Sequence, residues 1–169
     1  MSNWIEIREE RPGDVAAIRE LITLAFAQEQ EASIVDALRC NGAASLSLVA
    51  TENDRVIGHI LYSPASVGDV IGVGLAPLAV LPEHQRRGVG SRLVDAGTAR
   101  LRDAACPFVI VLGHAKYYPR FGFTPASTRG ISCEWDVPDE AFMVLILDQT
   151  RMRGVSGLAR YRPEFSTVA

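Results

Sequence analysis

The chain has 169 residues, a length typical of one domain that buries roughly 70% of the surface of its unfolded chain. Hydrophobic residues make up 48% and charged residues 22%, and the net charge of −3 argues against a protein built to coat nucleic acid or an anionic membrane. The three cysteines are odd in number and lack C-x-x-C spacing, and the three histidines are scattered, so we expect neither a disulfide framework nor a metal site. The N-terminus lacks a signal pattern and no apolar run reaches ~20 residues, which predicts a cytoplasmic protein.

Hydrophobic periodicity predicts an alternation of strands and helices along the chain. In chain order we expect a strand at 5–7, a helix opened by Pro12-Gly13-Asp14, a helix at 31–39, strands at 45–51, 56–62 and 73–81, a helix at 88–104, a strand at 108–112, a short helix at 115–120, and strands at 141–147 and 155–161. This order predicts a mixed α/β arrangement around one sheet, in which the strands at 73–81 and 108–112 are parallel. We expect a single domain over residues 1–169 with a loose, flexible tail at 163–169.

A glycine-rich segment joins the strand at 73–81 to the helix at 88–104. It reads Gln85-Arg86-Arg87-Gly88-Val89-Gly90-Ser91. The first turn of a helix carries unpaired N–H groups and a partial positive charge, and glycines allow a bulky anion to approach those groups. The arginines add charge, so the segment favours a pyrophosphate over a single carboxylate. A plain strand-to-helix turn with solvated arginines is the alternative. The segment is neither a Walker A loop nor a complete dinucleotide fingerprint.

This segment resembles the Q/R-x-x-G-x-G/A acetyl-CoA motif of the GNAT superfamily of N-acetyltransferases. Within that superfamily the chain is similar to the small bacterial YhbS-type acetyltransferases, which carry a segment like Gly113-His-x-x-Tyr-Tyr-x-Arg-Phe-Gly-Phe123. The resemblance implies the GNAT (acyl-CoA N-acyltransferase) fold, a central mixed sheet with splayed parallel strands flanked by helices, and acetyl-CoA as co-substrate without a metal. The cofactor-binding residues that it implies are Leu78, Ala79, Val80, Gln85, Arg86, Arg87, Gly88, Val89, Gly90, Ser91, His114 and Tyr118.

Pro77 interrupts the predicted strand at 73–81. Proline cannot donate to a ladder, so it indicates a bulge or an unpaired edge, or else irregular packing. In the GNAT fold this strand separates from its parallel neighbour, and the gap admits the pantetheine arm. The resemblance implies that the backbone N–H of Val80 polarises the thioester carbonyl, as an oxyanion donor does.

The resemblance also implies a catalytic acid, because a thiolate that leaves a thioester is protonated by a neutral acid nearby. The GNAT pattern selects Tyr118 for this role and leaves Tyr117 as a packing residue. The predicted strand at 73–81 contains no carboxylate, so the general base is open. Glu29 and Glu31 are candidate bases, with a solvated surface role as the alternative for each, and His114 is either a cofactor contact or a structural residue.

The leading hypothesis is an N-acetyltransferase that transfers acetyl from acetyl-CoA to a primary amine by direct attack in a ternary complex. The acceptor is a small molecule or peptide that the sequence does not identify. We expect the segments at 27–33, 62–70 and 125–138 to wall its site, with Trp135, Glu134 and Asp136 giving one wall an apolar and acidic character. Two alternatives stay open: a non-catalytic acyl-CoA-binding sensor and a protein-interaction domain. A homodimer through the final strands is compatible with the sequence.

Overall fold

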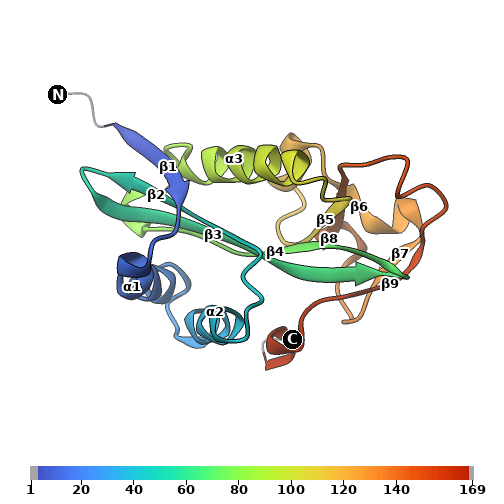
Figure 1. The fold of residues 1–169 in the computed structure, drawn as a ribbon, viewed down its shortest axis with the longest axis horizontal. Coiled ribbons are helices and arrows are strands. Elements are labelled where there is room, and N and C mark those ends of the chain that lie inside the picture. The colour runs from blue at the N-terminus through green and yellow to red at the C-terminus, as the bar shows by residue number, and fades with distance from the viewer. Residues whose placement is uncertain (1–3, 168–169) are drawn as a thin grey trace. The chain divides into compact units, whose positions relative to one another are not determined.

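The computed structural model describes residues 4–167, and these form two compact units (Figure 1). The first unit contains the chain up to Tyr62 together with Ala76–Thr98. The second contains Ser63–Leu75 and Ala99–Thr167. Two long neighbouring strands, β3 (Arg55–Val67) and β4 (Val70–Val80), run through both units, so each unit is described by itself.

The first unit packs helices on both faces of an antiparallel sheet. Its other elements are β1 (Ile5–Glu9), α1 (Val15–Phe26), α2 (Gln30–Cys40), β2 (Leu46–Glu52) and most of α3 (Val89–Asp103). β1 pairs with β2 and β2 pairs with β3, each antiparallel. Within this unit α1 and α2 cover one face of the strands and α3 covers the other (Figure 1). Gly58 of β3 allows α3 to approach closely, since a Cβ there would lie 3.0 Å from side-chain carbons of Val89 and Leu93.

The β2–β3 hairpin is tight and contains one extra residue. Asn53 and Asp54 both adopt left-handed backbone conformations, with φ of 51° and 63°, as a two-residue turn with the twist of its strands requires. The register passes from Ala50↔Gly58 to Thr51↔Val56, so Ile57 has no partner in β2. This β-bulge disrupts the ladder locally next to the end of β2.

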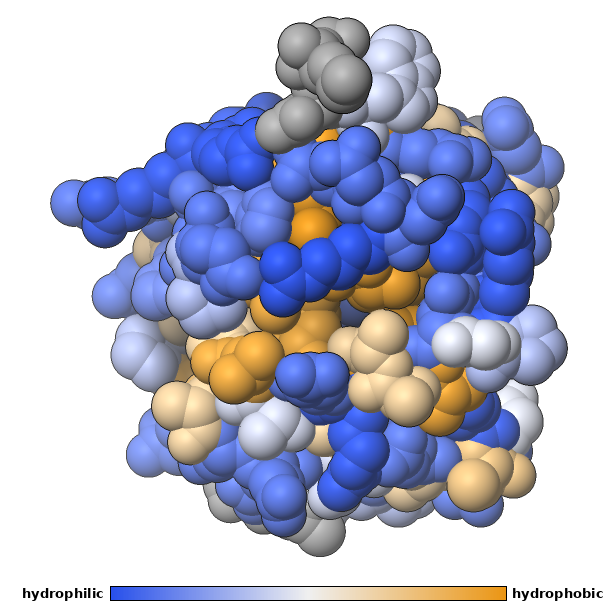
Figure 2. All heavy atoms as spheres, turned by 90° about the vertical axis from the view of Figure 1, so that its left-hand side faces the viewer, coloured by the Kyte–Doolittle hydropathy of each residue, from blue (hydrophilic) through white to orange (hydrophobic). Residues whose placement is uncertain are grey.

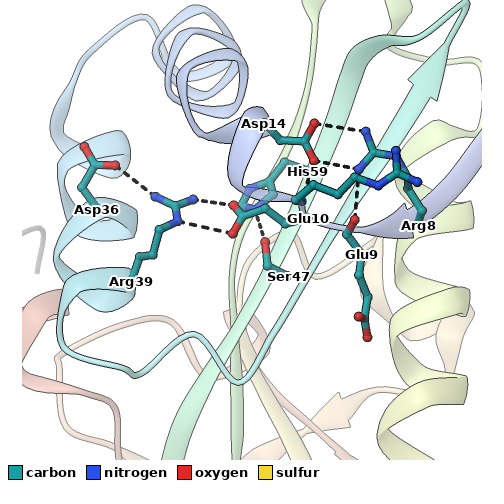
Figure 3. Close-up of polar contacts among 9 residues, drawn as sticks. Arg8, Glu9, Glu10, Asp14, Asp36, Arg39, Ser47 and His59 are labelled. Atoms are coloured by element: carbon teal, nitrogen blue, oxygen red, sulfur yellow. Dashed lines mark hydrogen bonds and ion pairs between the residues drawn. The ribbon is translucent and has the colours of Figure 1, made fainter.

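A polar network lies between α1, α2 and the strands of the first unit (Figure 3). His59 is fully buried, and its Nε2 lies 2.9 Å from Ser47 Oγ. Arg39 of α2 forms ion pairs with Glu10 and Asp36, and a further pair joins Arg8 to Asp14. Burial, together with the charge of Arg39, lowers the pKa of His59 from 6.5 to about 3, so its imidazole is neutral in the folded protein.

The second unit is built around a parallel strand pair. Besides its parts of β3 and β4, it contains β5 (Phe108–Leu112), β6 (Thr124–Pro125), β7 (Ile131–Cys133), β8 (Phe142–Ile146) and β9 (Gly157–Arg160). β4 pairs with β5 in parallel from Val73↔Val109 to Leu75↔Val111, which confirms the predicted direction. β8 pairs with β5 and β6, and β9 pairs with β3, all antiparallel, whereas β7 and β9 are parallel. The core of this unit includes Phe108, Ile110, Phe142 and Val144.

Parallel and antiparallel pairs occur together and helices flank the strands, so the predicted mixed α/β class is confirmed. The short strands β6 and β7 were not predicted, and β3 continues five residues beyond its predicted end at Tyr62. Residues 163–167 of the expected loose tail form a 3₁₀ helix in which Phe165 is buried, and residues 168–169 lie outside the described part of the chain. The mobility of this segment and the single-domain organisation stay predictions.

The face of the molecule shown in Figure 2 is mostly hydrophilic, with apolar side chains exposed near its centre. Exposed apolar side chains are ordinary on a globular surface. Among the described residues, no helix is both long enough and apolar enough to span a bilayer.

Candidate active site

The glycine-rich loop ahead of α3 belongs to the first unit and has an unusual backbone. Arg86 and Gly88 are left-handed, with φ of 63° and 80°, and Arg87 lies between them. Left-handed residues that alternate with ordinary ones turn successive N–H groups toward one concave point, which suits an anion. A Cβ at Gly88 would meet nothing within 4 Å, so the space in front of the loop is open.

The beginning of α3 adds the N–H groups of its first turn. Arg92 N donates to Gly88 O at 3.1 Å, which fixes where the helical hydrogen-bond ladder begins. The N–H groups at the start of this turn, at Val89 and Gly90, precede the first bond of that ladder, and such groups have no intrahelical acceptor by the geometry of a helix. The structure therefore brings the predicted pyrophosphate-binding segment together as one continuous curve from Arg86 into α3.

The carboxylate of Glu52 is hydrogen-bonded to two residues of the loop between β4 and α3. His84 Nε2 lies 2.9 Å from Glu52 Oε2, and Arg87 donates to Glu52 Oε1 at 3.1 Å. Only 9% of the Glu52 side chain is exposed. Burial alone would raise the pKa of Glu52, but the hydrogen bonds from Arg87 and His84 outweigh it and hold the pKa below its ordinary value, so the carboxylate is ionised at neutral pH.

The end of β4 is joined to the same loop by Gln85. Leu81 N donates to Ile57 O at 2.9 Å, so by strand alternation the backbone groups of Leu78 and Val80 point to the other edge of β4. At that edge Gln85 Nε2 donates to Val80 O at 3.0 Å. The same alternation turns the backbone groups of Ala79 toward β3, which makes Ala79 a poorer candidate for cofactor contact than the sequence indicated. The side chain of Gln85 thus fixes the strand end.

Pro77 lies just past the paired part of β4. The parallel register with β5 covers Val73–Leu75, and a cis peptide bond joins Ala76 to Pro77. Pro77 is the second residue after the pairing with β5 ends, which agrees with the predicted break in the ladder.

Tyr118 belongs to the second unit and begins the 3₁₀ helix Tyr118–Phe121. Its ring is 7% exposed and packs against Gly113, where a Cβ would lie 2.5 Å from the ring. Tyr117 and Phe123 contact the ring edge-on at centroid distances of 5.1 and 5.6 Å. Burial, with a smaller effect of Tyr117, raises the pKa of Tyr118 well above 10, so its phenol is protonated at physiological pH.

The remaining predicted residues have simple surroundings. Glu29 is exposed and its carbonyl accepts from Ser33 N at the start of α2. Glu31 accepts from Gln28 Nε2 at 2.8 and 3.1 Å. His114 is exposed, and its carbonyl accepts from Tyr117 N. Within residues 4–167 no cluster of His, Cys, Asp and Glu has the composition of a metal site.

A pocket of about 230 Å³ lies in the second unit beside the segment that was expected to wall the acceptor site. Trp135, Asp136 and Asp139 are among its lining residues, and Phe142 contributes to its apolar part. Trp135 stacks on Tyr161 at a centroid distance of 5.2 Å. An aromatic surface beside carboxylates is suited to a cationic group.

Sequence reasoning missed Glu52, which follows directly on the predicted strand at 45–51. Glu52 is 32 positions before His84 and 35 before Arg87, so no local motif joins the three. Its position at the end of a strand before a tight turn was visible in the sequence, but the face on which it lies depends on the register of β2 with β1 and β3.

The loop lies within a segment that matches a known protein family. Residues 15–123 match the model of the Acetyltransferase (GNAT) family. The chain is 36% identical to the N-acetyltransferase YhbS of Escherichia coli strain K12 over 95% of this chain and 98% of that protein. It is 42% identical to the N-acetyltransferase YjhQ of the same strain over 75% and 74% of the two chains.

Two solved structures are similar over nearly the whole chain. The structure of YhbS from Escherichia coli in complex with CoA has a TM-score of 0.95 at 34% identity and covers 100% of this chain and 96% of its own. A GNAT family acetyltransferase from Brucella melitensis in complex with acetyl-CoA has a TM-score of 0.81 at 35% identity and covers 97% and 99%. The chain therefore belongs to the GNAT family of acetyltransferases.

Proposed function

We propose that the chain transfers the acetyl group of acetyl-CoA to a primary amine by direct attack in a ternary complex. The observation that carries the proposal is the loop ahead of α3, where Arg86 and Gly88 are left-handed and the space in front of Gly88 is open. Backbone N–H groups gathered in this way suit a diphosphate. Relatives that are 34% and 35% identical were solved with CoA and acetyl-CoA.

Each part of the cofactor has its own proposed partners. The backbone N–H groups from Arg86 to Ser91, including those of Gly88, Val89 and Gly90, hold the diphosphate. The backbone groups of Leu78 and Val80 pair with the amides of the pantetheine arm, in the manner of a strand added to a sheet edge. Gln85 keeps Val80 in place through its bond to the Val80 carbonyl, and His114 is a further candidate contact.

In the proposed reaction the amine nitrogen attacks the thioester carbonyl carbon, a C–N bond forms and the C–S bond breaks. The Val80 N–H stabilises the negative charge that develops on the carbonyl oxygen. The Tyr118 phenol donates to the departing sulfur, and the amine nitrogen releases its proton to a base, for which Glu29 and Glu31 are the candidates. Since the pKa of Tyr118 is raised above that of a thiol, about 8.5, a hydrogen bond to the thiolate is its main contribution.

The acceptor is proposed to be a cationic amine of a small molecule or peptide. The pocket beside Trp135 and Asp136 offers an aromatic surface and a carboxylate for such a group. The cytoplasmic location and a homodimer stay predictions.

The test compares Gly88→Ala with Gly42→Ala. Both glycines are left-handed with no atom within 4 Å of the added Cβ, so the two substitutions carry the same kind of backbone strain, but only Gly88→Ala places a methyl group in the proposed cradle. We expect Gly88→Ala to weaken CoA binding about tenfold or more in calorimetry while Gly42→Ala binds like wild type. Mass spectrometry of an amine and lysine-peptide panel with acetyl-CoA then identifies acceptors.

No CoA binding by the wild-type protein would refute the proposal. CoA binding without acetylation of any amine in the panel would instead favour an acyl-CoA-binding sensor.

A further inference from the structure

Among the contacts within residues 4–167, Glu52 is the residue of β2 whose side chain bonds to two residues of the loop between β4 and α3. These two residues are His84 and Arg87. One carboxylate oxygen lies 2.9 Å from His84 Nε2 and the other accepts from Arg87 at 3.1 Å. We call Glu52, His84 and Arg87 the carboxylate clamp. The side chains of Glu52 and His84 are about one-tenth exposed, whereas that of Arg87 is 42% exposed. The clamp therefore joins the sheet to the loop from a buried position.

The register of β2 explains how the carboxylate reaches the loop. Side chains alternate between the faces of a strand, so Glu52 lies on the same face as Leu48 and Ala50. Ala50 is the partner of Gly58, and Gly58 faces Val89 at the start of α3. Glu52 is the last residue of this row and lies where α3 begins.

The clamp holds one residue on each side of left-handed Arg86. His84 precedes left-handed Arg86, and Arg87 precedes left-handed Gly88. A non-glycine residue in the left-handed region is held there only when its surroundings determine it. Two hydrogen bonds to one buried carboxylate, on either side of Arg86, supply that restraint.

A negative charge beside a diphosphate site has an obvious disadvantage, because like charges repel. The pairing with Arg87 offsets the Glu52 charge, and it also occupies part of the Arg87 side chain. The sequence had suggested Arg87 as a direct charge partner of the phosphates. In the structure one guanidinium nitrogen of Arg87 donates to Glu52, so part of the contribution of Arg87 to cofactor binding is expected to pass through the shape of the loop.

We infer that Glu52 is a positioning residue for acetyl-CoA, which holds the loop between His84 and Gly88 in its anion-binding conformation through His84 and Arg87. This inference rests on the proposed function. It predicts that loss of the Glu52 charge weakens cofactor binding although it removes a repulsive charge. A residue that served only the stability of the fold would leave affinity and loop order unchanged once the protein is folded.

The experiment compares Glu52→Gln with Glu83→Gln. Glu83 is on the same loop and pairs with Arg55 at 3.4 Å. Both side chains of this pair are more than half exposed, so Glu83 is a matched surface control. Hydrogen exchange of the peptide 82–91 is measured without ligand, and CoA affinity is measured by calorimetry. We expect Glu52→Gln to exchange faster in this peptide and to bind CoA about tenfold more weakly, with kcat changed far less than KM for acetyl-CoA. Glu83→Gln should match wild type in all three.

A double-mutant cycle with Arg87→Gln tests whether the two residues act as a pair. If they do, Glu52→Gln with Arg87→Gln binds CoA about as well as Glu52→Gln alone. Unchanged exchange in Glu52→Gln, unchanged or tighter CoA binding, or fully additive losses in the cycle would each overturn the inference. Absence of CoA binding in the wild-type protein would refute the proposed function instead, so the two failures are distinguishable.

Discussion

His59 Nε2 and Ser47 Oγ lie 2.9 Å apart on neighbouring strands, in a place where the imidazole has no exposure to solvent (Figure 3). A neutral imidazole that would have to charge on unfolding couples stability to pH. The His59 imidazole binds a proton near pH 6.5 in the unfolded chain, whereas in the folded protein it does so only near pH 3. Below pH 6.5 the unfolded state therefore holds more protons, and stability falls as the pH falls.

We predict that the free energy of unfolding decreases by up to roughly 1.4 kcal/mol per pH unit below pH 6.5 because of His59. His59→Gln should flatten this slope between pH 6.5 and 5, as measured by urea unfolding at a series of pH values. His114→Gln is the matched control, because that side chain is exposed and should leave the slope as it is. An equal slope in His59→Gln and wild type would show that the imidazole does not stay neutral in the fold.

Gly97 in α3 has no room for a side chain. A Cβ there would lie 2.4 Å from Tyr62 Oη and 2.7 Å from the ring, and Tyr62 is completely buried, so its ring has little freedom to move away. Glycine to alanine inside a helix ordinarily stabilises it by about 0.5–1 kcal/mol. Here we predict the opposite sign, a loss of about 1–3 kcal/mol from overpacking, measured as a lower urea midpoint. A midpoint at or above the wild-type value would contradict the packing described for α3.

Gln85 holds the end of β4 through its bond to Val80 O. Gln85→Met keeps the length of the side chain and removes the donor. We predict a higher KM for acetyl-CoA, about three- to tenfold, because the strand edge offered to the pantetheine arm is no longer fixed. Gln85 is exposed, so we expect the free energy of unfolding to stay close to the wild-type value. Steady-state kinetics and a urea titration together separate an effect on cofactor binding from an effect on stability. Kinetics identical to wild type would leave Gln85 without a positioning role.

Tyr118→Phe removes only the hydroxyl of a buried ring. We predict a fall in kcat of about 100-fold with CoA affinity retained, because the departing sulfur loses the hydrogen-bond donor positioned beside it. Tyr117→Phe is the control, since the neighbouring ring contacts Tyr118 edge-on and keeps that contact after the change. Turnover of Tyr118→Phe equal to that of wild type would remove the phenol from the mechanism.

Much of the fold follows from local patterns that the sequence displays openly. The run Phe108–Leu112 is apolar throughout and forms a buried strand, and the glycine-rich segment predicts the start of α3 to within a residue. The short strands β6 and β7 have two and three residues, too few for any periodicity, and their pairing with β8 and β9 exists only in three dimensions.

The candidate site was predictable where its residues are contiguous. The loop from Gln85 to Ser91 is a local feature, and two of its residues, Arg86 and Gly88, adopt left-handed conformations of the kind found in backbone anion sites. Glu52 was not predictable, because its role depends on strand register and on contacts across more than 30 positions. The direction of the Ala79 backbone groups was not predictable for the same reason: it depends on which edge of β4 faces β3.

The extra residue at Ile57 has a consequence for how this family member tolerates change. Its carbonyl is the acceptor for Leu81 N, the bond at which the chain leaves β4. Deleting Ile57 would remove the bulge, but it would turn every side chain between this position and the turn to the opposite face of the sheet. It would also remove the carbonyl that accepts from Leu81 N where the chain leaves β4. Natural length variation should therefore be absent from this hairpin and tolerated instead at exposed turns such as Gly68–Asp69.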